Sequence, residues 1–461
     1  METRSLKFVA EACAARVERG SGATAIQRVC TDSRQVQAGD LFFAIKGERF
    51  DGHDFVNEVT TRGVTAVVVE RKRLRPPLPD CAMLAVDDTR VALGRLAAAY
   101  RQAFELPVVA VGGSNGKTTV KELIASVLRQ KLTTLWSEAS FNNDIGVPLT
   151  LLRLDKSHQT AVLEAGTNHP GELAPLVKMI RPKYGVLTNI GREHLEFFGG
   201  VAGVAQEEGW LAELLPADGR LFANGDDEWT EPIARRTRAT VVRVGLGEKN
   251  DWRAKGIRLD KNGVTFRVES PKIEFNGEYR VNLLGRHQVV NALFAVAVSE
   301  ELGLGRPAVR DGLAECLPAK MRMQFWEAGG VRVLDDAYNA NTDSMVAALE
   351  TLCALPLQGR RVAVLGDMAE LGAQSEAAHA EIGRRAAELG IGQLFVVGRM
   401  APVVAAAARA AGLSRVIEFA DVEAAKNAVK HFVKAGDVVL LKASRTSRLE
   451  RIAETLKSEQ S

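Results

Sequence analysis

The sequence predicts an α/β protein built from three domains. Its 461 residues are about three times the length of a typical domain. From Pro107 onward, short β-branched runs alternate with amphipathic helical segments, which is typical of a mostly parallel sheet covered by helices. Changes in this texture divide the chain into domains 1–86, 87–317 and 318–461.

The composition is that of an ordinary globular protein. Apolar residues make up 46% of the chain, charged residues 25%, and the formal net charge is +3, so nothing indicates a nucleic-acid or membrane-surface partner. The five cysteines form no CxxC pair, which favours reduced thiols over disulfides or a thiolate metal site. No apolar run reaches the ~18 residues of a membrane span, and we expect a cytoplasmic protein.

The first domain is predicted to be a small α/β unit. Strand-like runs occupy Leu41–Ile45 and Val64–Val69, on either side of a glycine- and charge-rich stretch, 46–53. The basic run Arg71–Arg75 precedes a Pro-Pro pair, so it is interpreted as a solvated turn.

The two larger domains carry the alternation of strands and helices. Apolar runs predict strands at Val108–Val111, Ala161–Leu163, Gly185–Thr188, Arg361–Leu365, Leu394–Val397 and Val438–Leu441. Apolar positions that recur every three to four residues predict helices at Val120–Gln130, Gln288–Leu302, Ala308–Cys316, Val346–Leu355 and Ala377–Leu389. One segment differs: Val264–Val268, Ile273–Phe275 and Tyr279–Leu284 alternate around two Asn-Gly pairs, which predicts an antiparallel insertion.

A phosphate-binding loop is predicted at the start of the central domain. The strand 108–111 runs into a glycine-rich turn and then into a helical pattern, the order that phosphate binding requires. Lys117 is expected to lie against the β- and γ-phosphates, and Thr118 to offer its hydroxyl to Mg²⁺. Val111 stands where the usual motif has its first glycine, so a turn without a nucleotide is the alternative. The predicted nucleotide contacts are Gly113, Ser114, Asn115, Gly116, Lys117, Thr118 and Thr119.

This variant loop and further segments resemble the ATP-dependent Mur ligases along nearly the whole chain. The segments are 31–34, 46–53, 141–148, 164–171, 285–292, 335–341, 366–372 and 442–445. The resemblance implies an N-terminal domain that binds UDP, a central ATPase domain and a C-terminal Rossmann-like domain. It implies a cytoplasmic, monomeric enzyme of peptidoglycan synthesis that uses ATP and Mg²⁺ to join D-Ala-D-Ala to UDP-MurNAc-tripeptide through an acyl phosphate.

The resemblance also implies two Mg²⁺ sites and a set of catalytic residues. Thr118 and Glu164 are the candidates for the first metal, and His194 for the second; Glu164 as a solvated strand end and His194 as a structural residue are the alternatives. Mur ligases commonly place a CO₂-carbamylated lysine after this histidine, but the ungapped match puts Glu208 there. The hypothesis is that Glu208 supplies the missing negative charge; an ordinary surface glutamate is the alternative.

Four residues are implied to bind the nucleotide. Asn291 and His287 resemble the adenine-reading positions, with helix capping or packing as the alternative, and Asp336 resembles the ribose-binding aspartate. Arg322 resembles the arginine that reaches the ATP phosphates when a hinge near residue 318 closes. Lys117, Glu164, His194, Glu208 and Arg322 are therefore the predicted catalytic residues.

The remaining candidates are assigned to the two other substrates. The dipeptide is expected among Tyr338, Asn339, Asn341, Asp367, Glu370, Ser444 and Arg445. An arginine such as Arg445 suits its terminal carboxylate, because a guanidinium can bind both oxygens. The nucleotide sugar is expected near Ser33, Arg34, Lys46, Asn142 and Asn143, although the last two residues also favour a simple turn.

Two other functions fit part of the sequence. Another carboxylate–amine ligase, such as folylpolyglutamate synthase or the ligase that adds the third amino acid, shares the phosphate loop, but the segments 335–341 and 366–372 argue against both. A regulatory ATP-binding protein would need no second substrate domain.

Overall fold

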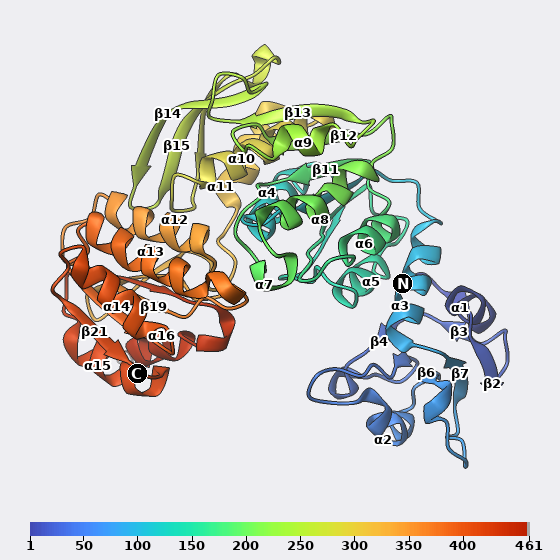
Figure 1. The fold of residues 1–461 in the computed structure, drawn as a ribbon. Helices are drawn as coiled ribbons and strands as arrows, with labels where there is room; N and C mark the ends of the chain where they lie inside the picture. The colour runs from blue at the N-terminus through green and yellow to red at the C-terminus, as the bar shows by residue number, and fades with distance from the viewer. Residues whose placement is uncertain (459–461) are drawn as a thin grey trace. The chain divides into compact units, whose positions relative to one another are not determined.

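The computed structural model describes residues 1–458 and divides into two compact units. The first unit comprises residues 1–110, 132–167 and 172–184, and the second comprises 111–131, 168–171 and the chain from 185 onward. Figure 1 shows the helices and strands of both.

The first unit contains the N-terminal sheet and part of the central region. Its strands are β1 Arg4–Ser5, β2 Arg16–Arg19, β3 Ala25–Ile26, β4 Val29–Cys30, β5 Leu41–Phe43, β6 Ala66–Glu70, β7 Ala82–Val86, β9 Thr134–Trp136 and β10 Thr160–Glu164. Its helices are α1 Leu6–Cys13, α2 Val56–Thr61, α3 Thr89–Arg101, α5 Gly146–Leu151 and α6 Leu173–Ile180.

The N-terminal sheet has the order β2-β7-β6-β5-β4, and all its neighbours are parallel except β2 and β7. Phe42, Val59, Val67 and Met83 pack together under it. The strands predicted at 41–45 and 64–69 are confirmed as β5 and β6. Asp88 starts α3 as its N-cap, because its carboxylate accepts the amides of the first turn.

The second unit begins at the carboxyl end of β8, Val108–Gly112, and continues into α4. Its central elements are α4 Lys117–Leu128, β11 Tyr184–Leu187, α7 Leu195–Phe198, α8 Val201–Glu213, β12 Arg220–Asn224, α9 Thr230–Ala234, β13 Thr240–Gly245, β14 Trp252–Asp260, β15 Gly263–Glu269, β16 Gly277–Val281, α10 Gln288–Glu301 and α11 Arg306–Glu315. The strands lie in the order β16-β15-β14-β13-β12-β11, and the sheet continues at β8.

The predicted antiparallel insertion is confirmed, with one correction. β15 pairs antiparallel with both β14 and β16 at the edge of the sheet, whereas β12, β13 and β14 pair parallel. The strand expected at Ile273–Phe275 is wrong: these residues form a 3-10 turn. Asn276 closes this turn by accepting the Ser270 amide at 2.7 Å, and Ile273 is left exposed. A three-residue apolar run does not distinguish a strand from a turn.

The C-terminal part folds around a six-stranded sheet of order β17-β18-β22-β19-β20-β21. Its elements are β17 Gln324–Ala328, β18 Val331–Asp336, α12 Thr342–Ala354, β19 Arg361–Gly366, α13 Ser375–Glu388, β20 Gln393–Val397, α14 Ala401–Ala410, β21 Val416–Phe419, α15 Val422–Phe432, β22 Val438–Lys442 and α16 Glu450–Lys457. Only β17 is antiparallel to its neighbour.

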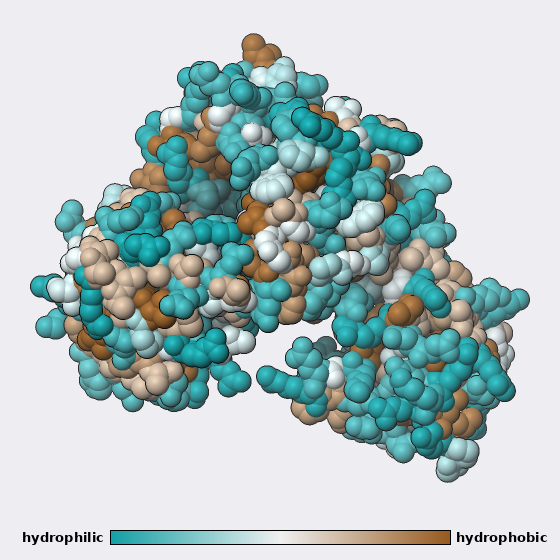
Figure 2. All heavy atoms as spheres, viewed as in Figure 1, coloured by the Kyte–Doolittle hydropathy of each residue, from teal (hydrophilic) through white to brown (hydrophobic). Residues whose placement is uncertain are grey.

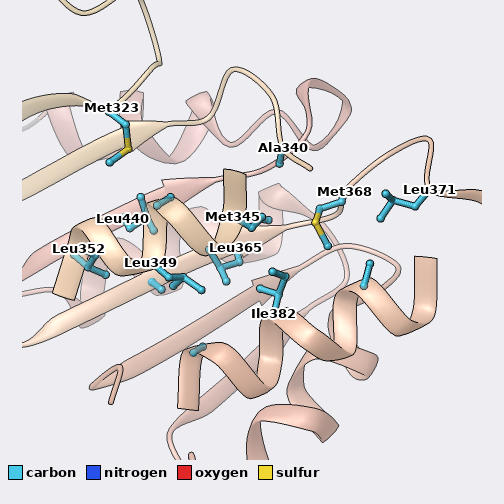
Figure 3. Close-up of a cluster of buried hydrophobic side chains, with 14 of the residues drawn as sticks. Met323, Ala340, Met345, Leu349, Leu352, Leu365, Met368, Leu371, Ile382 and Leu440 are labelled. Atoms are coloured by element: carbon cyan, nitrogen blue, oxygen red, sulfur yellow. The ribbon is translucent and has the colours of Figure 1, made fainter. Parts of the chain in front are cut away.

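Alternating side chains of β22 place helices on both faces of this sheet. Leu440 packs with residues of α12, α13 and α14, whereas Val439 and Leu441 pack with α15 and α16. Figure 3 shows the first of these clusters, which contains Leu349 of α12, Ile382 of α13 and the strand residue Leu365. Successive strand residues point to opposite faces, so a continuous apolar run is needed to bury both.

The polar surface and the state of the cysteines both fit the composition of an ordinary globular protein. Hydrophilic residues dominate the face in Figure 2, and the apolar ones form small separate groups. No helix within residues 1–458 is long and apolar enough to cross a membrane. All five cysteines are free thiols, as predicted.

Candidate functional site

The predicted phosphate loop joins β8 to α4 through two glycines that no other residue could replace without strain. Gly113 and Gly116 have φ values of 105° and 86°, which L-residues rarely adopt. A Cβ on Gly113 would lie 2.4 Å from Thr188 Oγ1, and one on Gly116 would lie 2.8 Å from Asn291 Oδ1. The loop therefore approaches two polar side chains closely, and the first N–H groups of α4 point out of the helix as an anion site.

Residues Thr188–His194, the brace segment, hold this loop in place. Asn189 accepts the Ser114 amide on its carbonyl at 2.8 Å and the Asn115 amide on Oδ1 at 3.0 Å. The Gly191 amide donates to Ser114 Oγ at 2.8 Å. These bonds fix the loop before any ligand binds, so little conformational entropy remains to be lost on binding.

Lys117, the first residue of α4, lies folded over the loop. Its Nζ donates to the carbonyls of Gly113 and Ser114 and lies 3.4 Å from Glu193 Oε2. Glu193 is buried, and its other oxygen accepts no hydrogen bond from residues 1–458. Glu193 thus supplies the negative charge that a largely buried ammonium needs.

Glu208, on α8, is fully buried against the same loop. Its Oε2 accepts the Gly113 amide at 2.7 Å, and within the described chain its Oε1 has no hydrogen-bond partner. Burial raises the pKa of Glu208 to about 7, and Glu193 acts in the same direction, whereas Lys117 and the Gly113 amide oppose the shift. The alternative of a surface glutamate is therefore wrong: Glu208 faces the phosphate loop.

His194 connects the brace segment to the C-terminal domain. Its Nδ1 is hydrogen-bonded to the Glu370 carboxylate, and its Nε2 lies 3.9 Å from Glu193 Oε2. The Glu196 amide also donates to the Glu370 carbonyl at 3.0 Å. The hydrogen bond from His194 holds the pKa of Glu370 below its usual value. The structure therefore brings together one predicted metal ligand and one predicted dipeptide residue.

Arg192 makes a second link between the central and the C-terminal domain. Its Nε lies 2.8 Å from Asp343 Oδ1, its backbone N–H donates to Asp343 Oδ2 at 2.8 Å, and its guanidinium forms bonds of 2.7 and 3.0 Å to Glu381. Both carboxylates raise the pKa of Arg192. A bidentate guanidinium pair of this kind fixes orientation as well as charge.

Replacing Arg192 with methionine is expected to loosen this link. The two carboxylates lose their shared cation, and because all three side chains are about one-third exposed, we expect a loss of only about 1–2 kcal/mol. Hydrogen exchange of the amides at 192–196 should then accelerate about 5- to 30-fold.

Arg385 provides the matched control, since it binds Glu350 and Glu388 on the surface of one domain with similar exposure. Arg385→Met should leave exchange at 192–196 unchanged. Unaltered exchange in folded Arg192→Met would show that the Arg192 pair does not hold the domains together.

Asp336 and Arg322 lie at the start of the C-terminal domain. Asp336 Oδ1 accepts the Met323 amide at 3.0 Å, and its Oδ2 lies 2.6 Å from Lys442 Nζ. The Arg322 guanidinium lies over the Tyr338 ring, 4.3 Å from its centroid. Arg322 and Tyr338, predicted to contact different substrates, thus contact one another.

Several predicted dipeptide residues hold the loops at the carboxyl edge of this sheet. Ser444 Oγ accepts the Ala369 amide at 2.8 Å and donates to the Ala340 carbonyl at 3.1 Å. Asp367 accepts the amides that precede α14.

Two further predicted dipeptide residues, Asn341 and Arg445, contact other side chains. Asn341 caps α12, and its Nδ2 donates to Asn115 Oδ1 at 2.9 Å, so it reaches the phosphate loop. Arg445 is half exposed and lies 3.1 Å from Glu450.

His287 and Asn291 lie at the start of α10, beside the phosphate loop. Asn291 Nδ2 donates to Gln288 Oε1 at 2.9 Å, while its Oδ1 faces Gly116. Although the His287 side chain remains exposed, the chain packed around its ring lowers its pKa; Asp336 opposes this shift and Lys442 adds to it. The structure thus gathers the predicted adenine and ribose residues in one neighbourhood.

The first unit holds the remaining carboxylate candidate, Glu164. It ends β10, is buried, and accepts Asn142 Nδ2 on Oε1 at 2.8 Å, while its Oε2 accepts no hydrogen bond within residues 1–458. The alternative of a solvated strand end is therefore wrong. Asn143 accepts the amides of Ile145 and Gly146, so the turn interpretation holds for this residue.

The other nucleotide-sugar candidates follow two neighbouring strands of the N-terminal sheet. Ser33 and Arg34 come after β4, and Lys46 comes after β5, which is parallel to β4. Arg34 and Lys46 are exposed, and Arg34 is held by Asp32, whose pKa this bond lowers to about 2.

Sequence reasoning missed Asn189, Arg192, Glu193 and Lys442. The first three lie in the same short segment as His194, directly after β11, where the carboxyl end of a parallel strand commonly carries functional residues. That position was the available signal for Asn189 and Glu193. Nothing local indicates the partners of Arg192 or Lys442, which lie more than 100 residues away in the chain.

Comparison with known proteins identifies the family. Three family models match: "Mur ligase family, catalytic domain" at residues 25–101, "Mur ligase middle domain" at 111–299, and "Mur ligase, glutamate ligase domain" at 321–445. The UDP-N-acetylmuramoyl-tripeptide–D-alanyl-D-alanine ligase of Escherichia coli is 38% identical over 94% of both chains.

Solved structures agree with these matches. Crystal structure I of MurF from Acinetobacter baumannii superimposes with a TM-score of 0.91, at 32% identity and over 100% of both chains. MurF from Thermotoga maritima in complex with ADP gives 0.82, at 28% identity, over 94% of this chain and 97% of its own. With this similarity spread over all three domains, the chain belongs to the Mur ligase family and, within it, to the MurF type.

Proposed function

We propose that the protein is an ATP-dependent ligase that joins D-alanyl-D-alanine to UDP-N-acetylmuramoyl-tripeptide in peptidoglycan synthesis. The products are UDP-N-acetylmuramoyl-pentapeptide, ADP and phosphate. The observation that carries this proposal is the match over 94% of the chain to a ligase of that name, because it includes the nucleotide loop and both flanking domains.

Amide formation requires an activated carboxylate, since the carboxylate anion itself does not react with an amine. In the proposed reaction a carboxylate oxygen of the tripeptide attacks the γ-phosphorus of ATP, the bond to the β,γ-bridging oxygen breaks, and ADP leaves. The free amine of the dipeptide then attacks the acyl carbon. The tetrahedral intermediate expels phosphate, and the nitrogen loses a proton.

The phosphate loop supplies most of the electrostatic stabilisation in this scheme. Lys117 lies at the N-terminus of α4, where its charge and the helix amides both favour the transferring phosphoryl group. Arg322 adds a second cation once it leaves the ring of Tyr338. Excluding water protects the acyl phosphate from hydrolysis.

The buried carboxylates fit Mg²⁺, which prefers oxygen ligands. Glu164 and Glu208 each have one buried oxygen that accepts no hydrogen bond within residues 1–458. By the resemblance, Thr118 and Glu164 would hold one ion, and His194 and Glu208 the other. When bound, Mg²⁺ would offset the negative charge of the phosphates.

The other site residues retain the roles that the resemblance implies. Asn291 and His287 would read adenine and Asp336 the ribose. The dipeptide would bind among Tyr338, Asn339, Asn341, Asp367, Glu370, Ser444 and Arg445, and the nucleotide sugar among Ser33, Arg34, Lys46, Asn142 and Asn143. We also infer a cytoplasmic monomer, since ATP and UDP-linked precursors are cytoplasmic and one chain supplies every proposed site residue.

Phosphate release from the purified protein tests this function. We expect release only when ATP, Mg²⁺, UDP-N-acetylmuramoyl-tripeptide and D-alanyl-D-alanine are all present. Chelating Mg²⁺ with EDTA should lower the rate at least about 100-fold, and added Mg²⁺ should restore it. ATP turnover that needs neither of the other substrates would favour a regulatory ATPase, and turnover with a different acceptor would favour another ligase.

A further inference from the structure

We propose that Lys442 is a positioning residue for the nucleotide: it holds the Asp336 carboxylate in the orientation that receives the ribose hydroxyls. This inference rests on the ribose-binding role that the proposed function gives to Asp336. Lys442 itself is not proposed to contact the nucleotide.

The sheet of the C-terminal domain brings the two residues together. β18 and β22 are parallel neighbours, and Asp336 is directly opposite Lys442 in their register, at the carboxyl ends of both strands. Lys442 Nζ lies 2.6 Å from Asp336 Oδ2 and also donates to the Asn339 carbonyl at 3.1 Å. The ammonium is therefore fixed by two acceptors, one in the last residue of β18 and one three residues further along the chain.

The burial of the Lys442 side chain indicates that the pair orients a group rather than stabilises the fold. The Lys442 side chain is only 3% exposed, and that of Asp336 is 15% exposed. Removing both charges from water costs about as much as their attraction returns, so an apolar pair would serve the fold as well. The pair is therefore better explained by what it orients than by the stability it adds.

The geometry leaves the Asp336 carboxylate able to bind further donors. Oδ1 accepts the Met323 amide at 3.0 Å and Oδ2 accepts Lys442, which uses two of about four acceptor positions. The carboxylate of Asp336 is partly exposed, so its remaining acceptor positions are open to the two ribose hydroxyl groups. Without Lys442 the carboxylate is anchored on one oxygen only and is free to rotate.

The test compares ATP with 2′,3′-dideoxy-ATP, which lacks the ribose hydroxyls. Lys442→Met should raise the KM for ATP about 10-fold while kcat and the KM values of the other two substrates change less than about threefold. With dideoxy-ATP, Lys442→Met and the unaltered protein should have the same KM. Asp336→Asn should also raise the KM for ATP and leave the KM for dideoxy-ATP unchanged. The double variant should have the same KM for ATP as Asp336→Asn alone.

Two further variants keep the test decisive. Lys442→Arg preserves the charge and should recover part of the affinity for ATP, which also covers the case that Lys442→Met fails to fold. Lys426→Met removes a partly exposed lysine that is paired with Glu423, and it should change none of these KM values.

These measurements distinguish a failure of the ribose role of Asp336 from a failure of the positioning role of Lys442. If Asp336→Asn leaves the KM for ATP unchanged, the ribose role of Asp336 is wrong. If Asp336→Asn raises it but Lys442→Met does not, or if Lys442→Met weakens ATP and dideoxy-ATP equally, the positioning role of Lys442 is wrong.

Discussion

Replacing Lys117 with methionine is expected to lower kcat at least about 1000-fold, because the lysine charge acts directly on the transferring phosphoryl group. Methionine keeps an unbranched side chain of nearly the same length but removes the charge that stabilises the transferring phosphoryl group. It also leaves Glu193 without its cation, and the pKa of Glu208 should rise further because Lys117 opposes its upward shift. The measurement is kcat at saturating concentrations of all three substrates.

Lys131→Met is the control for this variant, since Lys131 is exposed just beyond the end of α4. It should keep full activity. If folded Lys117→Met protein retains more than about one-tenth of the activity, Lys117 does not act on the phosphates as proposed.

Removing the Glu208 carboxylate is expected to lower kcat about 100-fold. In Glu208→Gln the amide oxygen still accepts the Gly113 N–H, so the loop keeps its hydrogen bond while the negative charge is lost. The unaltered protein should be indifferent to bicarbonate, because its charge is encoded rather than formed from CO₂. In Glu208→Lys, by contrast, bicarbonate should restore part of the activity by carbamylating the lysine.

Glu207 offers a matched control one residue away. It lies on the same helix and accepts the Gly171 amide at 3.0 Å, whereas Glu208 accepts the Gly113 amide of the phosphate loop. Glu207→Gln should change kcat less than about threefold. Full activity and unchanged Mg²⁺ dependence in Glu208→Gln would refute the carboxylate hypothesis.

The sequence predicted the features that depend on local pattern. The strand, glycine turn and helix around Lys117 follow from glycine conformation and apolar periodicity, and the two faces of β22 follow from its continuous apolar run. The same reasoning placed Glu164 at the end of a strand, whereas the position of Glu208 followed from the family resemblance. Their burial was not readable, because it depends on which elements cover them.

What the sequence did not predict is the choice of distant partners. Arg192 could pair with any exposed carboxylate, and only the packed domains select Asp343 and Glu381. Lys442 pairs with Asp336 through the register of two strands that lie about 100 residues apart in the chain. Such contacts are tertiary, so local propensity contains no information about them.

The most direct test of the ligase mechanism follows the carboxylate oxygen. The tripeptide precursor is prepared with ¹⁸O in both oxygens of its terminal carboxylate and converted with ATP and D-alanyl-D-alanine. Attack of that carboxylate on the γ-phosphorus predicts one ¹⁸O atom in the released phosphate for each pentapeptide formed, as measured by mass spectrometry. Pentapeptide with unlabelled phosphate would contradict the acyl phosphate, and phosphate release without pentapeptide would contradict the ligase itself.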